Sequence, residues 1–427
     1  MRRFWTGGAS APPGGPSESL RDSQDFRRDS QDHALWPLAW TLGWTELISW
    51  GILYYAFSAL LVPMQDELGW SKATITGAYS LSTLVSGLLA PMVGRWIDAR
   101  GARWLMTFGS ILGAIMLLAW SRTESIPHFY LVWIGMGIAM ACTLYDPAFA
   151  AIAPWYRANR GKAMLIITFL GGLASTVFLP ATGWLEHRFG WRDALVYLMI
   201  FLAVTTILPH AMVLRAPPEG HAHRDRPSII ASFRQLIQTA WFRRFSLAFF
   251  LQSFVSNAVA VYMIAYLVDQ GVSPTTAALT AGIIGAAQTG ARVVVTVFGR
   301  AANETMLAAA MFALQAVAVV ILVIWPTGMT MVIAAILLGF GRGALTLLRP
   351  TILLDHYDVR EFGAVNGSLA AILTIALASA PVVTGIAVEW FHGYALVFSV
   401  YALIALISAI VLVSTRSIPT PAMVDAR

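Results

Sequence analysis

The sequence predicts an all-α membrane protein in which twelve transmembrane helices form two pseudo-symmetric six-helix bundles. Three observations predict this fold: an apolar composition, twelve long apolar stretches and an internal repeat. Of the 427 residues, 58% are hydrophobic and only 12% are charged, whereas a soluble protein carries about 25% charged residues. Because lipid offers no hydrogen-bond partner to the backbone, each apolar stretch must be helical where it crosses the bilayer.

The apolar stretches are long enough to span a membrane, since a spanning helix needs about 20 mostly apolar residues. Six belong to each half of the chain. We place them near residues 36–63, 73–97, 103–120, 127–154, 161–187, 192–214, 244–268, 274–299, 304–325, 328–354, 363–389 and 393–414.

The second half of the chain repeats the first at an offset of about 202 residues. The segment ELGWSKAT, which begins at Glu67, reappears as DQGVSPTT from Asp269. A long-period repeat in an apolar chain indicates two related halves, an arrangement typical of secondary transporters that work by alternating access. Further pairs at this offset are Gly161 with Gly363, Gly183 with Gly385, and Phe189 with Phe391.

Hydrophilic segments divide the chain into five parts. The first 33 residues are polar and contain RDSQD twice, which is typical of a disordered tail. The longest internal hydrophilic segment ends in SIIASFRQLIQTAWF, whose apolar spacing predicts an amphipathic helix on the membrane surface. We therefore expect a cytoplasmic tail (1–33), an N-terminal bundle (34–215), a linker (216–243), a C-terminal bundle (244–415) and a second cytoplasmic tail (416–427).

The net charge of +6 does not indicate a nucleic-acid partner, because the basic residues follow membrane topology. By the positive-inside rule, their distribution places both termini in the cytoplasm. We expect a multi-pass protein of a bacterial inner (cytoplasmic) membrane, in contact with the lipid bilayer. The basic residues of the cytoplasmic side are Arg95, Arg100, Arg103, Arg157, Arg160, Lys162, Arg215, Arg224, Arg226, Arg234, Arg243, Arg244 and Arg300, against Lys72, Arg122, Arg188 and Arg192 on the opposite side.

The chain lacks the patterns of an enzyme or a metalloprotein. A single cysteine, Cys142, excludes an intramolecular disulfide and a cysteine-built metal site. His221 and His223 in the linker are weak metal ligands without further support. There is no P-loop and no catalytic triad in a credible position, so we predict no catalytic residue, no cofactor and no metal.

The loop after the second apolar stretch, GRWIDARGAR at 94–103, resembles the hallmark loop of the major facilitator superfamily. Its glycines permit a tight turn at the membrane surface. The resemblance covers residues 36–415 and implies that this loop latches the cytoplasmic side when the protein faces outward; the alternative is an ordinary basic turn. The residues at the hallmark positions are Gly94, Asp98, Arg100, Gly101 and Arg103.

Three further segments resemble the monocarboxylate-porter and oxalate/formate-antiporter branch of that superfamily: WGILYYAF (50–57), WYRANRGKA (155–163) and GAAQTGARV (285–293). The resemblance implies that Arg292 is the arginine that binds the substrate carboxylate. The chain departs from the branch in two places, since Gln288 replaces an aspartate and no lysine follows YYAF. The proton-coupling chemistry of the branch therefore does not carry over to this chain.

Charges inside a membrane are costly, so each one is a functional hypothesis. Asp146 and Arg349 each precede a proline in the corresponding fourth and tenth spans. We expect them, with Arg342, to form a cytoplasmic gate that closes when the site faces outward. The alternative is that Arg349 reaches the membrane interface along its own apolar stem.

Glu46 in the first span is the candidate for proton coupling, because burial favours the neutral carboxyl group and so allows proton exchange. The alternative is a solvated glutamate at a helix end. For the substrate we expect contacts from Arg292, Gln288, Tyr54 and Tyr55, since a guanidinium binds a carboxylate with two parallel hydrogen bonds. Arg292 could instead form a structural ion pair with Glu46 or Asp146.

These patterns predict a secondary active transporter that moves a small organic anion, a monocarboxylate or dicarboxylate, by alternating access. A proton or a counter-anion would supply the energy, and spans 1, 4, 7 and 10 would line the cavity. One alternative is efflux of drugs or other lipophilic compounds by the same fold. A second is a membrane sensor that binds a ligand without transporting it.

Overall fold

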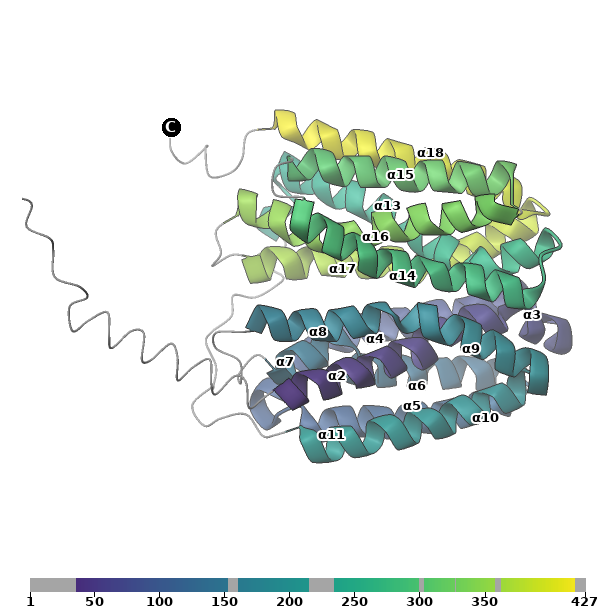
Figure 1. The fold of residues 1–427 in the computed structure, drawn as a ribbon. Helices are drawn as coiled ribbons and strands as arrows, with labels where there is room; N and C mark the ends of the chain where they lie inside the picture. Colours follow the sequence, from purple (N-terminus) through teal and green to yellow (C-terminus); the bar gives the residue numbers. More distant parts are fainter. Residues whose placement is uncertain are drawn as a thin grey trace, which may run out of the picture.

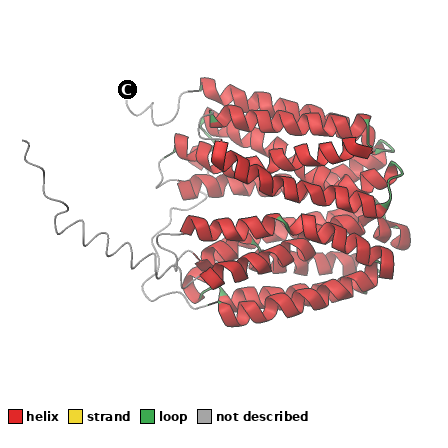
Figure 2. Cartoon of the chain, in the orientation of Figure 1, coloured by secondary structure: helices red, strands yellow, loops and turns green. Residues whose placement is uncertain are grey.

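The computed structural model describes residues 36–152, 160–214, 234–298, 303–326, 328–357 and 362–418. This part is almost entirely helical (Figure 2), and it holds twelve helices long and apolar enough to cross a membrane, which confirms the predicted fold class. The helices form two stacked bundles, one from each half of the chain (Figure 1). The predicted tail 1–33, linker residues 216–233 and residues 419–427 lie outside the described part.

Each predicted span matches one helix or one broken helix, and the last residues of the predicted linker already belong to helix α13. The first bundle consists of α2 (Trp36–Ser49), η1 (Trp50–Tyr55), α3 (Ala56–Leu68), α4 (Lys72–Arg100), α5 (Arg103–Ser121), α6 (Ile126–Thr143), α7 (Tyr145–Ile152), α8 (Arg160–Gly172), α9 (Ala174–Phe189), α10 (Trp191–Leu202), η2 (Ala203–Ile207) and α11 (Leu208–Val213). The second consists of α13 (Ala240–Asp269), α14 (Pro274–Phe298), α15 (Glu304–Ile324), α16 (Gly328–His356), α17 (Phe362–Trp390), α18 (Tyr394–Val413) and η4 (Ser414–Ser417).

The sequence repeat corresponds to one helix–turn–helix corner built twice. Gly69 (φ 67°) and Gly271 (φ 83°) both adopt the left-handed backbone that glycine accepts without strain. Ser71 then caps α4 by accepting a hydrogen bond from the backbone N–H three residues on (3.1 Å), and Ser273 caps α14 in the same way (3.3 Å). The repeated sequence therefore marks equivalent turns at the starts of two equivalent helices, α4 and α14.

Helices α14 and α16 touch through their backbones. A Cβ atom added to Gly339 would meet the carbonyl oxygen of Ile284, and one added to Gly343 would meet that of Gln288. Small residues at such contacts are what allows membrane helices to pack closely. This contact fixes the position of Gln288 and Arg292 against α16.

We expect Gly343→Ala to destabilise the protein by about 1–3 kcal/mol, because a backbone oxygen cannot rotate away and the two helices must separate. The measurement is the thermal unfolding midpoint in detergent. Gly367→Ala in α17 is the matched control, since nothing lies within 4 Å of its added Cβ. Equal midpoints for the two variants would contradict the tight α14–α16 contact.

The two bundles are joined most closely at the ends remote from the described chain termini, on the right in Figure 1. There, Glu389 of α17 accepts a hydrogen bond from the backbone N–H of Ala73 in α4 (2.9 Å), and Tyr262 of α13 donates one to Thr76 (3.1 Å). Helix α4 packs along α17, and α9 packs along α14. The structure is therefore closed at the remote side.

Candidate functional site

A π-helical segment interrupts the first span and gathers its aromatic side chains. Segment η1 places Trp50 and Tyr54 with ring centroids 5.0 Å apart, and Tyr54 and Tyr55 5.2 Å apart. Gly51 lies against the ring of Phe178, where any Cβ would collide. Irregular helical turns of this kind are frequent at functional sites, and this one turns an aromatic wall toward the second bundle.

Glu46 lies one turn before this segment and is fully buried. Neither carboxylate oxygen has a partner in hydrogen-bonding geometry among the described residues, although the Trp50 indole and Asp146 both act on Glu46 electrostatically. A buried, unpaired carboxylate is expensive. The alternative hypothesis, a solvated Glu46 at a helix end, therefore does not fit this conformation.

Asp146 follows a break in the fourth span. Leu144 between α6 and α7 has an extended backbone (φ −81°, ψ −166°), and Pro147 follows two residues after α7 begins. Proline lacks an N–H and clashes with the preceding helical turn, so the helix restarts here. The break places Asp146 in the first turn of α7, where an anion is favoured, and leaves its side chain exposed.

The facing wall, from the second bundle, carries a polar cleft of about 190 Å³ between α13, α16 and α17. Arg342, Thr346 and Arg349 share one face of α16, since residues at i, i+4 and i+7 lie on one side of a helix. Gln252 of α13 adds an amide that is only 2% exposed. The full lining is Phe249, Gln252, Ser253, Ser256, Arg342, Leu345, Thr346, Arg349 and Leu377.

Arg292 lies between the two bundles and is bonded to both. Its Nη1 donates to the backbone oxygen of Thr168 in α8 (2.6 Å), and its Nε donates to Oγ1 of Thr346 in α16 (3.2 Å). The Tyr145 phenol of α7 also interacts with it. The alternative of an ion pair with Glu46 is not formed among the described residues, because neither Glu46 oxygen has a partner.

The other predicted substrate residues lie deeper. Gln288, Tyr55 and Arg342 line one small cavity of about 10 Å³ between the bundles, together with Ser175 of α9. Tyr54 donates a hydrogen bond to Oδ1 of Asn257 in α13 (2.9 Å). The structure thus brings Tyr54, Tyr55, Gln288 and Arg342 together. Arg292 lies nearer to the side of the molecule that carries the described chain termini.

The predicted gate residues face each other without direct contact. The Arg349 guanidinium acts electrostatically on the Asp146 carboxylate, but the two form no ion pair among the described residues. Arg342 lies between the cleft and the small cavity, since it lines both of them. The gate contact predicted from the sequence is therefore not formed in this conformation.

Several uncharged polar residues that line or adjoin the cleft were not predicted from the sequence. Gln252, Ser253, Ser256 and Asn257 are uncharged polar residues spaced along α13 so that they gather on one side of the helix. This spacing in an otherwise apolar span was the available signal. Among the described residues, no group of three His, Cys, Asp or Glu side chains lies close enough to hold a metal ion.

The predicted latch loop is shorter than expected. Gly94 lies inside α4, which continues to Arg100, and the turn is made by Gly101, whose φ of 79° suits glycine. The Arg100 and Arg103 guanidinium groups lie over neighbouring tryptophan rings at 4.4 Å and 5.1 Å. The backbone of Asp98 belongs to α4.

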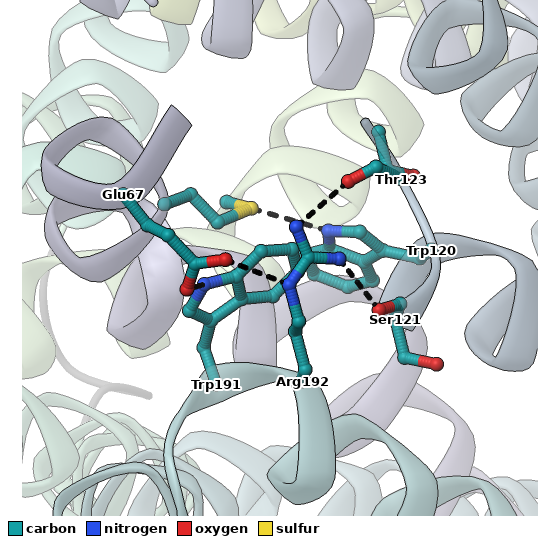
Figure 3. Close-up of polar contacts among 7 residues, drawn as sticks. Glu67, Trp120, Ser121, Thr123, Trp191 and Arg192 are labelled. Carbon is teal, nitrogen blue, oxygen red and sulfur yellow. Dashed lines mark hydrogen bonds and ion pairs between the residues drawn. The ribbon is translucent and has the colours of Figure 1, made fainter. Parts of the chain in front are cut away.

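A second charged cluster lies outside the cleft and wholly within the first bundle (Figure 3). Glu67 at the end of α3 accepts hydrogen bonds from Arg192 Nε (2.7 Å) and Trp191 Nε1 (2.6 Å) at the start of α10. Arg192 also donates to the backbone oxygens of Ser121, the last residue of α5, and of Thr123 just beyond it (2.8 and 2.9 Å). We call this set the remote clamp, since it ties the remote ends of three spans together.

Comparison with known proteins agrees with this architecture. The family model of the Major Facilitator Superfamily matches residues 42–327. MFS-type transporter 1 of Ophiocordyceps sp. (strain BCC 1869) is 27% identical over 357 residues, which cover 80% of this chain and 74% of that protein. A structure of a mutant of the nucleoside transporter NupG superposes with a TM-score of 0.71 at 14% identity, covering 88% of this chain and 98% of that one.

Two other relatives come from the branch that the sequence resembles. Monocarboxylate transporter 13 of Rattus norvegicus is 24% identical over 306 residues (70% of this chain, 68% of that protein). The oxalate:formate antiporter of Oxalobacter formigenes is 26% identical over 174 residues (40% of each chain). With a family match over most of its length and twelve spanning helices in two related bundles, this chain belongs to the Major Facilitator Superfamily and is a membrane transporter rather than an enzyme.

Proposed function

We propose that this transporter moves a small organic anion, a mono- or dicarboxylate, coupled to protons or to a counter-anion. The observation that carries the proposal is the charge of the two facing walls. The second bundle presents Arg292, Arg342 and Arg349, whereas the first presents Glu46 and Asp146. This leaves one positive charge in excess, or two if Glu46 is protonated, which favours an anion.

The names of the relatives support the same substrate class, since one is a monocarboxylate transporter and another an oxalate:formate antiporter. Arg292 is the group we infer to bind the substrate carboxylate. In this conformation its Nη1 is held by the Thr168 carbonyl of the opposite bundle. A carboxylate that replaced this carbonyl would gain a charge-assisted pair of hydrogen bonds and would loosen a tie between the bundles.

We infer that the termini face the cytoplasm, as the basic residues predict, and that the described conformation is therefore inward-facing. Glu46 is then the proton-coupling group. Loading Glu46 with a proton would remove the burial penalty of its charge while the bundles rearrange. The lipophilic-efflux alternative rests on the aromatic wall formed by Trp50, Tyr54 and Tyr55.

The proposal is tested by ligand-induced thermal stabilisation of the purified protein with a panel of carboxylates and lipophilic cations. We expect at least one carboxylate to raise the unfolding midpoint and Arg292→Ala to weaken its binding by about 10- to 100-fold, as for a lost hydrogen bond to a charged group. Arg95→Ala on the exposed end of α4 is the matched control. Stabilisation by lipophilic cations alone, equal in wild type and Arg292→Ala, would favour efflux instead.

A further inference from the structure

Arg342 is the cation of the cleft to which the proposed function assigns no partner of its own. Asp146 acts on Arg349, and Arg292 is bonded to Thr168 and Thr346. Among the described residues no carboxylate lies within ion-pair distance of Arg342, and the groups that act on it are the neutral phenols of Tyr54 and Tyr79. An intramembrane guanidinium with only neutral neighbours is costly, so an anionic ligand is the partner it lacks.

The surroundings of Arg342 are built to donate hydrogen bonds. Gln252 is 2% exposed and lines the same cleft; its Oε1 accepts from Ser408 (2.9 Å), which leaves Nε2 as a buried donor without a partner among the described residues. The hydroxyl groups of Ser253 and Ser256 lie along the same wall. Buried donors without partners are uncommon in proteins, and together with a guanidinium they suit a carboxylate.

The distance between this group and Arg292 is set by helix α16. Arg292 donates to Thr346, which stands one helical turn from Arg342 on the same face. One turn of helix rises about 5.4 Å. Arg342 and Thr346, the residue that holds Arg292, thus lie about one turn apart along α16 beside a cleft of about 190 Å³, which suits a ligand with two carboxylates separated by a short carbon chain.

We propose that Arg342, Gln252, Ser253 and Ser256 form a second carboxylate subsite, and that the substrate is a dicarboxylate of about four carbons whose other carboxylate binds Arg292. This inference rests on the proposed function, because it divides the recognition of one anion between two arginines. A monocarboxylate would fill only the Arg292 subsite. The directly joined carboxylates of a two-carbon diacid would be too short to reach both arginines.

The test compares succinate with butyrate, a monocarboxylate of the same chain length, at neutral pH. Affinity is measured from the shift of the unfolding midpoint and from competition in liposome counterflow. We expect wild type to bind succinate about 10- to 100-fold more tightly than butyrate. Arg342→Gln removes that preference because it weakens succinate binding much more than butyrate binding, whereas Arg292→Gln weakens both acids.

Gln252→Leu provides a second variant should Arg342→Gln fail to fold, and we expect it to reduce succinate binding alone. Equal affinities of wild type for the two acids would overturn the second subsite, as would an equal loss of both acids in Arg342→Gln. Those outcomes leave the organic-anion function standing. If wild type binds and transports neither acid nor any other carboxylate, the proposed function fails together with this inference.

Discussion

We expect reversal of both charges of the Asp146–Arg349 pair to restore transport that either single reversal abolishes. In the described conformation these residues act on each other across an open cleft without an ion pair. When the bundles close at the terminus side, α7 and α16 approach, and we expect the pair to form a direct contact. A coupling energy of about 2 kcal/mol corresponds to about a thirtyfold difference in the population of the closed state.

The measurement is uptake into liposomes by Asp146→Arg, by Arg349→Asp and by the double variant. Asp355→Arg is the matched control, because Asp355 lies on α16 like Arg349 but is exposed and does not line the cleft. We expect the two single variants to be inactive, the double variant to recover a substantial part of the wild-type rate, and the control to transport normally. A double variant as inactive as the singles would show that the two charges do not act as a gate.

Glu46→Gln is expected to abolish accumulation driven by a pH gradient while leaving exchange of substrate for substrate. The glutamine keeps the shape of a protonated glutamate but cannot release a proton. Glu46 is fully buried and interacts with the Trp50 indole, and the side-chain oxygen of the glutamine can still accept from that donor. Stability should therefore be unchanged or higher, because a buried charge has been replaced by a neutral group.

The two activities are separated by measuring uptake with and without an imposed pH gradient, and counterflow in proteoliposomes preloaded with substrate. Glu124→Gln, in the exposed turn before α6, is the control that removes a carboxylate elsewhere. Gradient-driven accumulation by Glu46→Gln at the wild-type level would remove Glu46 from the coupling step. It would also favour a counter-anion as the energy source.

The spans could be predicted from the sequence because hydropathy and helix caps are local properties. The repeat was predictable for the same reason, since Gly69 and Gly271 occupy positions where the backbone itself selects glycine. The positions of Arg292 and Glu46 could be inferred because charges in a membrane are rare and costly.

The packing of the helices against one another could not be predicted from the sequence. Arg342 was expected at the gate, yet it lines both the cleft and the closed cavity, a position set by how α16 packs on α14. The bond from Arg292 to the Thr168 carbonyl has no sequence signal, since every residue carries a carbonyl group. Gln252 was missed because a buried glutamine is also a common packing residue in a helix.

Among the residues that the structure describes, the remote clamp has no counterpart in the second bundle, although the repeat provides the corner for one. At the offset of 202 residues, Asp269 stands where the first bundle has Glu67, and Tyr394 stands where it has Arg192. That corner instead receives a residue of the first bundle, since the Lys72 ammonium lies 4.7 Å from the centre of the Tyr394 ring and Asp269 acts on it electrostatically. The corner at Glu67 therefore holds helices of its own bundle together, whereas the equivalent corner at Asp269 contacts the first bundle. Opening of the remote side would separate Lys72 from Tyr394 and Asp269, so this step would break contacts between the bundles while leaving the remote clamp inside the first bundle intact.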